Sequence, residues 1–260
     1  MLLGLVVVAY NQPAWTARLF ESASGSGHDV SFHLFLHSDD TETARVCDEL
    51  ARRTDVTYYP YGVNRGLSRT WNEGVLAAYD EGADVVIVAN DDVAFGPGDV
   101  GRIAAKAVAA RDRYVVSCAG YHERLGRRLP SHGYSCVAIN PIAIETIGCF
   151  DENFFPAYCE DQDYARRAAL AGLVEENCPD TNVVHGGSSA IFASPSLMRA
   201  NALTQARNMA YYVRKWGDHA GRERFATPFG DPELGLRIAP EERASPYGPE
   251  YDRADRLATA

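Results

Sequence analysis

The sequence of 260 residues predicts an α/β fold, with a mostly parallel central sheet flanked by helices. Short apolar runs alternate with helical patterns from the first residue onward. These runs are continuous rather than alternating, which is typical of strands that are buried on both faces. In such a sheet the connections are right-handed crossovers, and ligands bind at the carboxyl ends of the strands.

The first predicted strand is the apolar run LLGLVVVA at residues 2–9. A signal peptide would begin with basic residues and a membrane span would be longer, whereas this run ends before Asn11. We expect later strands at residues 30–36, 56–61, 83–89, 114–119, 134–139 and 181–184. Helices are expected at residues 13–24, 40–53, 67–79, 99–110, 141–147 and, the longest, 196–216.

The pattern predicts one domain over residues 1–217 and an irregular C-terminal tail over residues 218–260, packed on the domain or extending from it. The tail is rich in proline, glycine and charged residues and has little apolar periodicity. Residues 121–130 contain three arginines and are expected to form a basic loop.

Composition limits the classes of partner. A net charge of −10 argues against nucleic acid, which favours a basic face. No stretch is long and apolar enough for an integral membrane segment. The six cysteines form no C-x-x-C pair, so we expect free thiols in a reducing cytoplasm. The sequence leaves open whether the protein is a homo-oligomer.

Polar residues follow the first four strands, where this architecture gathers its ligand groups. Asn and Asp at such places are also common turn formers and helix caps. All four strand ends together favour a binding site. They are Ala9-Tyr10-Asn11, His37-Ser38-Asp39-Asp40, Asn64-Arg65-Gly66 and Asn90-Asp91-Asp92.

The group Asn90-Asp91-Asp92 offers hard oxygen ligands that suit Mg²⁺ or Mn²⁺ bridging a diphosphate. The sequence contains no glycine-rich phosphate loop, so a metal ion is the natural substitute. His185 follows a later strand. A lone histidine there is more often structural, but a neutral imidazole can complete a carboxylate metal site.

Three acidic residues crowd the start of a predicted helix within residues 150–172. Asp163 is interpreted as a helix-stabilising partner of Arg167, four residues on. Glu160 and Asp161 precede the helix proper and are candidates to face a cleft, where a carboxylate acts as a base.

Five motifs occur in order along the chain: VVVAYNQ, NRGLSRTWNEG, DVVIVANDDVAF, IGCFDENFFPAYCEDQDYARRAALAG and VVHGGSSA. Together they resemble the inverting GT-A glycosyltransferases of family 2, in particular the rhamnosyl- and galactofuranosyl-transferase-like branch. The resemblance covers roughly residues 2–217. It implies a Rossmann-like GT-A fold, a nucleotide-sugar donor, Mn²⁺ or Mg²⁺, and inversion by direct displacement.

The resemblance also implies residue roles. Asn90-Asp91-Asp92 is similar to the D-x-D element, with Asp92 on the metal and Asp91 on the ribose or metal. Asp161 is similar to the base, with Glu160 beside it, and His185 to a histidine that completes the metal site. The helix N-terminus is expected to keep Asp161 ionised and to weaken it as a base.

Further donor contacts follow from the same resemblance. Asn64, Gly66 and Asn72 match an N-x-G…N-x-G element, and Arg65 is a candidate diphosphate contact. Two positions depart from the family pattern. Asn90 is a weaker ligand than aspartate, and His37 occupies the place of an aspartate that reads the nucleobase, with Asp39 slightly later. UDP- and dTDP-sugars are expected first, with GDP-sugars next.

Two other functions stay open at this point. A sugar nucleotidylyltransferase would require a glycine-rich, basic first loop, which Ala9-Tyr10-Asn11-Gln12 does not supply. A catalytically silent nucleotide-sugar binding module would keep the donor residues and lose the acidic pair. The acceptor is equally open among a glycan, a lipid-linked glycan, a small molecule and a protein.

Overall fold

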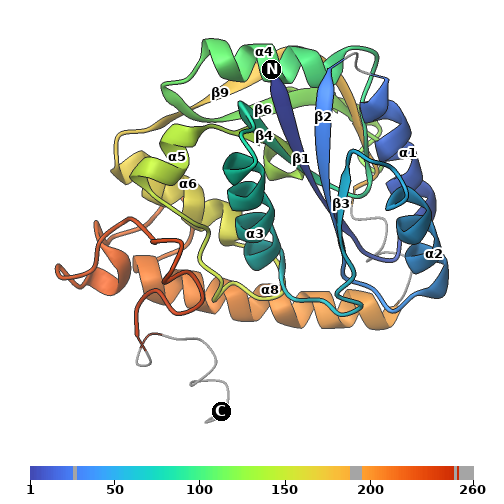
Figure 1. Ribbon diagram of the computed structural model, residues 1–260. Coiled ribbons are helices and arrows are strands. Elements are labelled where there is room, and N and C mark those ends of the chain that lie inside the picture. The colour runs from blue at the N-terminus through green and yellow to red at the C-terminus, as the bar shows by residue number, and fades with distance from the viewer. Residues whose placement is uncertain (26–27, 188–194, 249–250, 252–260) are drawn as a thin grey trace. The chain divides into compact units, whose positions relative to one another are not determined.

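The structure is a computed structural model that describes residues 1–25, 28–187, 195–248 and 251 (Figure 1). The chain forms two compact units. Unit 1 comprises Met1–Asn64, Glu73–Ile142 and Val174–Ser194, and unit 2 comprises Arg65–Asn72, Ala143–Leu173 and Pro195–Ala260. The predicted boundary between a domain at residues 1–217 and a tail stays a prediction.

Unit 1 contains the predicted parallel sheet. Four neighbouring strands run parallel in the order β3-β2-β1-β4. Their bounds are Leu2–Ala9 (β1), Asp29–Leu36 (β2), Val56–Tyr59 (β3) and Val85–Asn90 (β4). The buried apolar runs on β1 and β4 explain their central places, because a strand covered on both faces needs apolar side chains on both.

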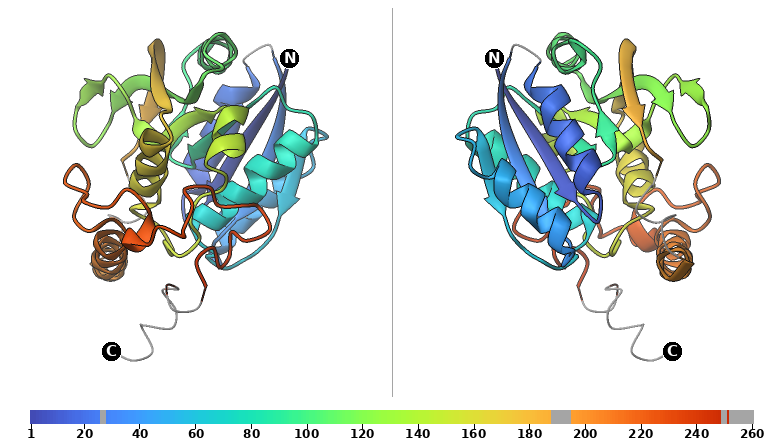
Figure 2. Two further views of the ribbon diagram at one scale, coloured as in Figure 1. Left: turned by 90° about the vertical axis from the view of Figure 1, so that its left-hand side faces the viewer. Right: turned by 90° about the vertical axis from the view of Figure 1, so that its right-hand side faces the viewer.

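Helices cover both faces of this sheet (Figures 1 and 2). Side chains from α1, α2 and α4 pack with Leu3, Leu5 and Val7 in one core. The opposite face of β1 carries Gly4, and α3 approaches it so closely that a Cβ there would lie 2.6 Å from Ala78 Cβ. The helices are α1 (Pro13–Ser24), α2 (Thr41–Leu50), α3 (Leu67–Asp80) and α4 (Asp99–Ala109).

The sheet continues beyond β4 in the order β8-β6-β9-β5. β8 is antiparallel to both β4 and β6, while β9 is parallel to β6 and antiparallel to β5. The bounds are Val93–Ala94 (β5), Arg113–His122 (β6), Cys136–Ile139 (β8) and Val174–His185 (β9). A 3-10 turn at Gly133–Ser135 precedes β8.

The basic loop expected at residues 121–130 is wrong. β6 continues to His122, and Arg127–Leu129 form β7, which pairs antiparallel with β6. Gly126 sits in the turn at φ +63. The sequence pattern does not indicate this hairpin, because its outer strand is exposed and contains arginines, as is common for edge strands. Arg128 donates hydrogen bonds to the Pro179 and Thr181 carbonyl oxygens, at 2.9 and 2.6 Å.

The strand expected at residues 181–184 is three times longer in the structure. Its additional first half, VEENCPD, contains acidic residues and Pro179 and lacks an apolar run. Most of β9 pairs with β6 alone, so this half is an edge in which exposed charge and proline are tolerated.

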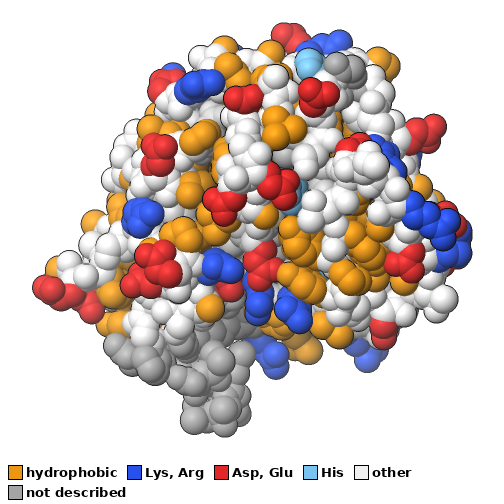
Figure 3. Space-filling view, viewed as in Figure 1, with side chains coloured by type: hydrophobic (Ala, Val, Ile, Leu, Met, Phe, Trp, Pro, Cys, Tyr) orange, Lys and Arg blue, Asp and Glu red, His pale blue; other side chains and the backbone are white. Residues whose placement is uncertain are grey.

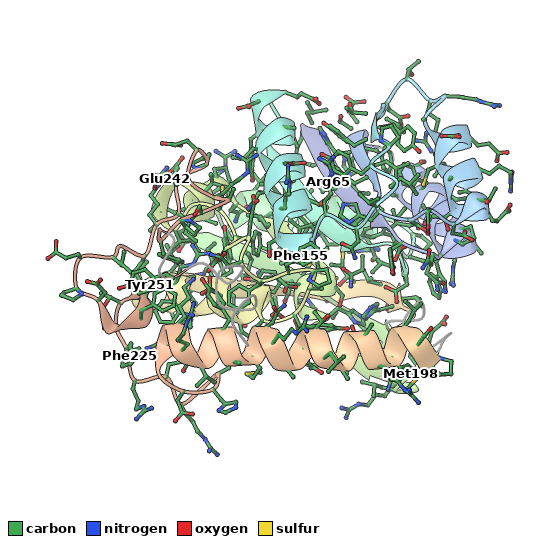
Figure 4. The ribbon with its side chains drawn as sticks, turned by 90° about the horizontal axis from the view of Figure 1, so that it is seen from below. Arg65, Phe155, Met198, Phe225, Glu242 and Tyr251 are labelled. Atoms are coloured by element: carbon green, nitrogen blue, oxygen red, sulfur yellow. The ribbon has the colours of Figure 1, made fainter. Side chains whose placement is uncertain are left out.

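Unit 2 is built around α6 (Glu160–Leu170) and α8 (Pro195–Trp216), with the short α5 (Pro141–Thr146) entering it. Its apolar core contains Phe154, Tyr211, Tyr212 and Trp216. Figure 4 shows α8 along its whole length, with Met198 near its first turn. The first half of α8 is mostly exposed, while its second half carries the buried residues.

The described part of the C-terminal segment packs within unit 2. The Cys149 amide donates to the Ile238 carbonyl oxygen at 2.9 Å, and the Ile238 amide donates to the Ile147 carbonyl oxygen at 3.1 Å. Ile238 and Tyr247 are buried, and the only regular element in the described part is a 3-10 turn at Pro228–Gly230. Residues 249–250 and 252–260 of the predicted tail lie outside the described residues.

No helix within the described ranges has the length and apolar character needed to cross a membrane. The face drawn in Figure 3 carries acidic and basic side chains interspersed with each other. It therefore shows no single basic patch of the kind that nucleic acid binding requires.

Candidate functional site

Asp92 and His185 are brought together by the pairing of β5 with β9. Val93 lies opposite His185 in this ladder, and the Gly186 amide donates to the Asp92 carbonyl oxygen at 2.8 Å. As a result His185 Nε2 lies 3.3 Å from Asp92 Oδ1, and both side chains are buried. Two residues 93 positions apart in the sequence thus form one carboxylate–imidazole pair at a strand end.

Asp91 has a different environment from its neighbour. Its Oδ2 accepts a hydrogen bond from the Tyr10 amide at 2.6 Å, which ties the end of β4 to the end of β1. Burial raises the pKa of Asp91 well above its usual range, and the Tyr10 hydrogen bond opposes that rise. Asn90, the preceding residue, is half-buried at the end of β4.

Two further histidines lie against His185, and the sequence interpretation missed both. His122 is directly opposite His185 in the β6–β9 ladder, with ring centroids 4.9 Å apart. His132 follows β7, and its ring centroid lies 5.6 Å from that of His185. Burial, followed by the charge of His185, lowers the pKa of His122 and lowers that of His132 to about 4.

The ends of β1 and β2 form a second polar group in unit 1. The Ala9 carbonyl oxygen accepts from the His37 amide at 3.0 Å, and the Ser38 hydroxyl donates to Asn11 Oδ1. Asn11 adopts φ +57, a left-handed conformation that asparagine tolerates better than most residues. Asp39 is exposed, and the ring of the buried His37 lies 5.9 Å from that of Tyr61.

Asp40 caps α2, as a residue after a strand often does. Its Oδ2 accepts from the Thr43 amide at 2.8 Å and from the Thr43 hydroxyl at 2.7 Å. Its side chain is therefore engaged in helix capping.

The predicted donor element Asn64-Arg65-Gly66 is divided between the units, with Asn64 in unit 1. Asn64 and Arg65 are exposed, whereas Gly66 is buried at φ +90. A Cβ at Gly66 would lie 2.8 Å from the ring of Phe155, so only glycine fits without displacing that ring. Figure 4 labels Arg65 and Phe155.

The side-chain amide of Asn72 makes hydrogen bonds through both its nitrogen and its oxygen within unit 2. Its amide nitrogen donates to the Phe150 carbonyl oxygen at 2.9 Å, and its amide oxygen accepts from the Phe150 amide at 2.8 Å. The same nitrogen also donates to Glu152 at 3.1 Å. These contacts fix the loop that leads to α6, and the predicted donor contact of Asn72 stays a prediction.

Glu160 opens α6 in an environment that disfavours its charge. The side chain is 5% exposed, and Oε2 has no hydrogen-bond partner within the described residues. Burial, followed by the charge of Asp161, raises the pKa of Glu160 to about 8. Tyr158 and Cys159 precede it at φ +80 and +69, a strained backbone that concentrates at functional sites. Asn208 holds this loop by donating to the Ala157 and Tyr158 carbonyl oxygens.

Asp161 is half-buried at the next position and accepts from the Gln162 amide at 2.8 Å. We expected the helix N-terminus to dominate and to weaken this base. Instead burial outweighs the backbone hydrogen bonds and raises the pKa of Asp161. The carboxylate is therefore a stronger base than the helix dipole alone predicts.

The expected pair of Asp163 and Arg167 is confirmed, at 2.9 Å and fully buried. It belongs to a larger buried group in unit 2. Lys215 Nζ lies 2.6 Å from Asp163 Oδ1 and 2.8 Å from Asp151 Oδ2. Two acids and two bases balance in charge, so this network is structural.

The donor set in unit 1 fits a divalent cation with two protein ligands. Asp92 supplies a carboxylate and His185 an imidazole nitrogen that makes no hydrogen bond within the described part of the chain. Considering only the described residues, no three histidine, cysteine or acidic side chains converge to hold a metal as they lie. A cation held by these two residues would need its remaining ligands from outside the described protein side chains, such as water. Residues 188–190, the end of the VVHGGSSA motif, lie outside the described residues.

Comparison with known proteins bears on this site. The family model described as Glycosyl transferase family 2 matches residues 5–157, which is more than half of the chain. A galactofuranosyl glycosyltransferase of Leishmania donovani is 54% identical over 77 residues, which are 30% of this chain and 17% of that protein. The chain thus spans a small part of that relative.

Solved structures agree in fold. TarS 1-349 of S. aureus has a TM-score of 0.56 at 14% identity, over 78% of this chain and 65% of that one. The mannosyltransferase PcManGT of Pyrobaculum calidifontis, in complex with GDP-Man and Mn²⁺, has a TM-score of 0.59 at 16% identity, over 82% and 64%. At these identities the likeness shows the fold, and it confirms the α/β class expected from the sequence.

Proposed function

Because this chain belongs to glycosyl transferase family 2, we propose that it transfers a sugar from a nucleoside-diphosphate sugar to an acceptor hydroxyl, with a divalent metal and inversion at the anomeric carbon. The observation that carries the metal-dependent part is the buried pair of Asp92 and His185 at the ends of β4 and β9. The solved structure of PcManGT contains GDP-Man and Mn²⁺, and TarS was solved with UDP, which supports a nucleotide-sugar donor here.

On the donor side, Asp92 and His185 would hold Mn²⁺ or Mg²⁺. Such an ion offsets the negative charge that develops on a leaving diphosphate. Asp91 fixes the strand end through the Tyr10 amide, so we assign it first to positioning and then to the ribose. The ends of β1 and β2, at Ala9, Asn11, His37 and Asp39, are proposed to bind the nucleoside.

On the acceptor side, we assign Asp161 as the base. The acceptor hydroxyl gives its proton to the Asp161 carboxylate, its oxygen attacks the anomeric carbon, and the bond from that carbon to the diphosphate breaks. Glu160, whose pKa is about 8, is protonated at neutral pH and leaves the negative charge to Asp161. Asn64, Arg65 and Gly66 are proposed to contact the donor, Arg65 at the diphosphate.

UDP- and dTDP-sugars are the proposed donors, and the acceptor is a hydroxyl of a glycan, a lipid-linked glycan, a small molecule or a protein. We also propose a cytoplasmic location. The six cysteines are free and buried, which supports a reducing compartment.

The test is release of nucleoside diphosphate from a panel of nucleotide sugars, for the wild type and Asp161→Asn. Asp112→Asn is the matched control, because its side chain is 72% exposed. We expect Asp161→Asn to lose about 10²-fold or more in rate, the scale of a general base, and to keep donor affinity. Donor binding without Asp161-dependent turnover would indicate a silent binding module. Formation of nucleoside triphosphate from pyrophosphate would indicate a nucleotidylyltransferase.

A further inference from the structure

Several buried ring nitrogens near Asp92 make no hydrogen bond within the described residues. They are His122 Nδ1, His185 Nε2, which lies 3.3 Å from Asp92 Oδ1, and both ring nitrogens of His132. Buried polar atoms in native proteins are nearly always satisfied, and an exception points to a bound water or ion. The His122 and His185 rings lie edge to face at opposed positions of the β6–β9 ladder, with centroids 4.9 Å apart.

The backbone is shaped to keep these rings close. A Cβ at Gly187, which has φ +83, would lie 2.3 Å from His122 Cε1. A Cβ at Gly186 would lie 3.1 Å from the Trp15 ring and 3.3 Å from Asp92 Cβ. Consecutive glycines after His185 thus leave room for His122 on one side and Asp92 on the other. Such a cradle indicates a built site.

We propose that His122 is a third protein ligand of the cation held by Asp92 and His185, and that it makes the site prefer first-row transition metals over Mg²⁺. The inference rests on the divalent cation of the proposed function, held by Asp92 and His185. Two imidazoles and one carboxylate favour ions such as Mn²⁺, Co²⁺ or Zn²⁺, because Mg²⁺ prefers oxygen ligands and retains water.

His122 is chosen over His132 on position. His122 lies directly opposite His185 in the β6–β9 ladder, with ring centroids 4.9 Å apart, and its ring is half-buried at the end of β6. The buried ring of His132 lies farther from that of His185, with centroids 5.6 Å apart. Since no three donors in the described residues converge as they lie, the His122 ring must rotate about its side-chain bonds when the cation binds. The ring of His132 lies near both of these rings, with centroids 6.2 Å from His122 and 5.6 Å from His185, and acts as a positioning residue.

The experiment counts nitrogen ligands on Mn²⁺ in the full chain without donor. Pulsed electron paramagnetic resonance reports two imidazole nitrogens for the wild type under this proposal. We expect one nitrogen in His122→Ala and one in His185→Ala, and two in His132→Ala. The exposed His219→Ala is the control and should retain two. Calorimetry should show Mn²⁺ affinity falling about tenfold or more in His122→Ala, with Mg²⁺ affinity changed less than twofold.

One nitrogen in the wild type, or unchanged Mn²⁺ affinity in His122→Ala, would overturn the proposal. Loss of a nitrogen in His132→Ala but not in His122→Ala would do the same. If His122→Ala does not fold, His122→Gln keeps a side chain of similar length and is expected to show one nitrogen. The count of nitrogens does not depend on sugar transfer, which the release assay above measures, so the two proposals fail separately. Mn²⁺-dependent transfer in that assay with one nitrogen here keeps the proposed function alone, and two nitrogens here without transfer keep only this inference.

Discussion

Lys215 Nζ lies 2.6 Å from Asp163 Oδ1, and both side chains are fully buried in unit 2. Burial alone would raise the pKa of Asp163, but Lys215 and Arg167 outweigh it and lower that pKa. Burial likewise would lower the pKa of Lys215, and Asp151 and Asp163 together raise it. Each charge is therefore stabilised by its partners, and the network links α6 to α8.

Replacing Lys215 by Met should destabilise the protein by about 3–5 kcal/mol, because two buried carboxylates would lose a shared cation. Chemical denaturation followed by circular dichroism measures this loss. Arg207→Met on the same helix is the control, since Arg207 is exposed and should change the free energy of unfolding by about 0.5 kcal/mol or less. Equal effects of the two substitutions would show that the network adds nothing.

The raised pKa of Glu160 predicts that the free energy of unfolding falls as the pH rises. Its pKa in the folded protein is about 8, above the ordinary glutamate value of 4.5. Between these values the folded state holds the proton and the unfolded chain has lost it. The contribution is thus fully present below pH 4.5 and is lost as the pH rises through about 8. Melting temperatures measured from pH 5 to pH 9 should fall less steeply in Glu160→Gln than in the wild type.

The exposed Glu242→Gln is the matched control for this pH series and should follow the wild type. Asp161 also has a raised pKa and contributes a slope of the same sign, so Glu160→Gln should reduce the slope without abolishing it. A wild-type slope unchanged by Glu160→Gln would contradict the buried, protonated state of this side chain.

The parallel part of the fold was predictable, because buried strands such as β1 and β4 appear in the sequence as continuous apolar runs. The hairpin of β6 and β7 and the first half of β9 were not, since exposed charge masks strand pattern at an edge. This explains why His122 was missed. Its place opposite His185 depends on the pairing of β6 with β9, which no local pattern encodes.

The acidic residues of α6 show the same limit. The sequence placed Asp163 beside Arg167 because residues four apart on a helix are neighbours. It contained no sign of Lys215, which comes from another helix 52 positions later in the chain. Similarly, the helix dipole at Asp161 follows from local structure, whereas the burial that raises the pKa of Asp161 depends on tertiary packing.

Gly66→Ala should be more destabilising than Gly62→Ala. Both glycines have positive φ, at +90 and +65, so either substitution carries backbone strain of about 1–2 kcal/mol. At Gly62 a Cβ meets nothing within 4 Å, but at Gly66 it would lie 2.8 Å from the Phe155 ring. The additional loss of stability in Gly66→Ala, measured by denaturation, gives the cost of the steric contact with Phe155. Equal losses would mean that Phe155 moves aside freely.

Substitutions of Asn72 and Asn64 should distinguish a residue that positions a loop from a residue that binds the donor. Asn72→Ala leaves the buried Phe150 amide and carbonyl without their partner, so we expect a loss of stability of about 1–3 kcal/mol. Asn64 is exposed, so Asn64→Ala should cost less stability than Asn72→Ala and should weaken UDP binding if the predicted donor role is correct. Denaturation and titration calorimetry with UDP measure the two effects. If Asn72→Ala keeps its stability and loses UDP affinity, Asn72 contacts the donor and its bonds to Phe150 are dispensable.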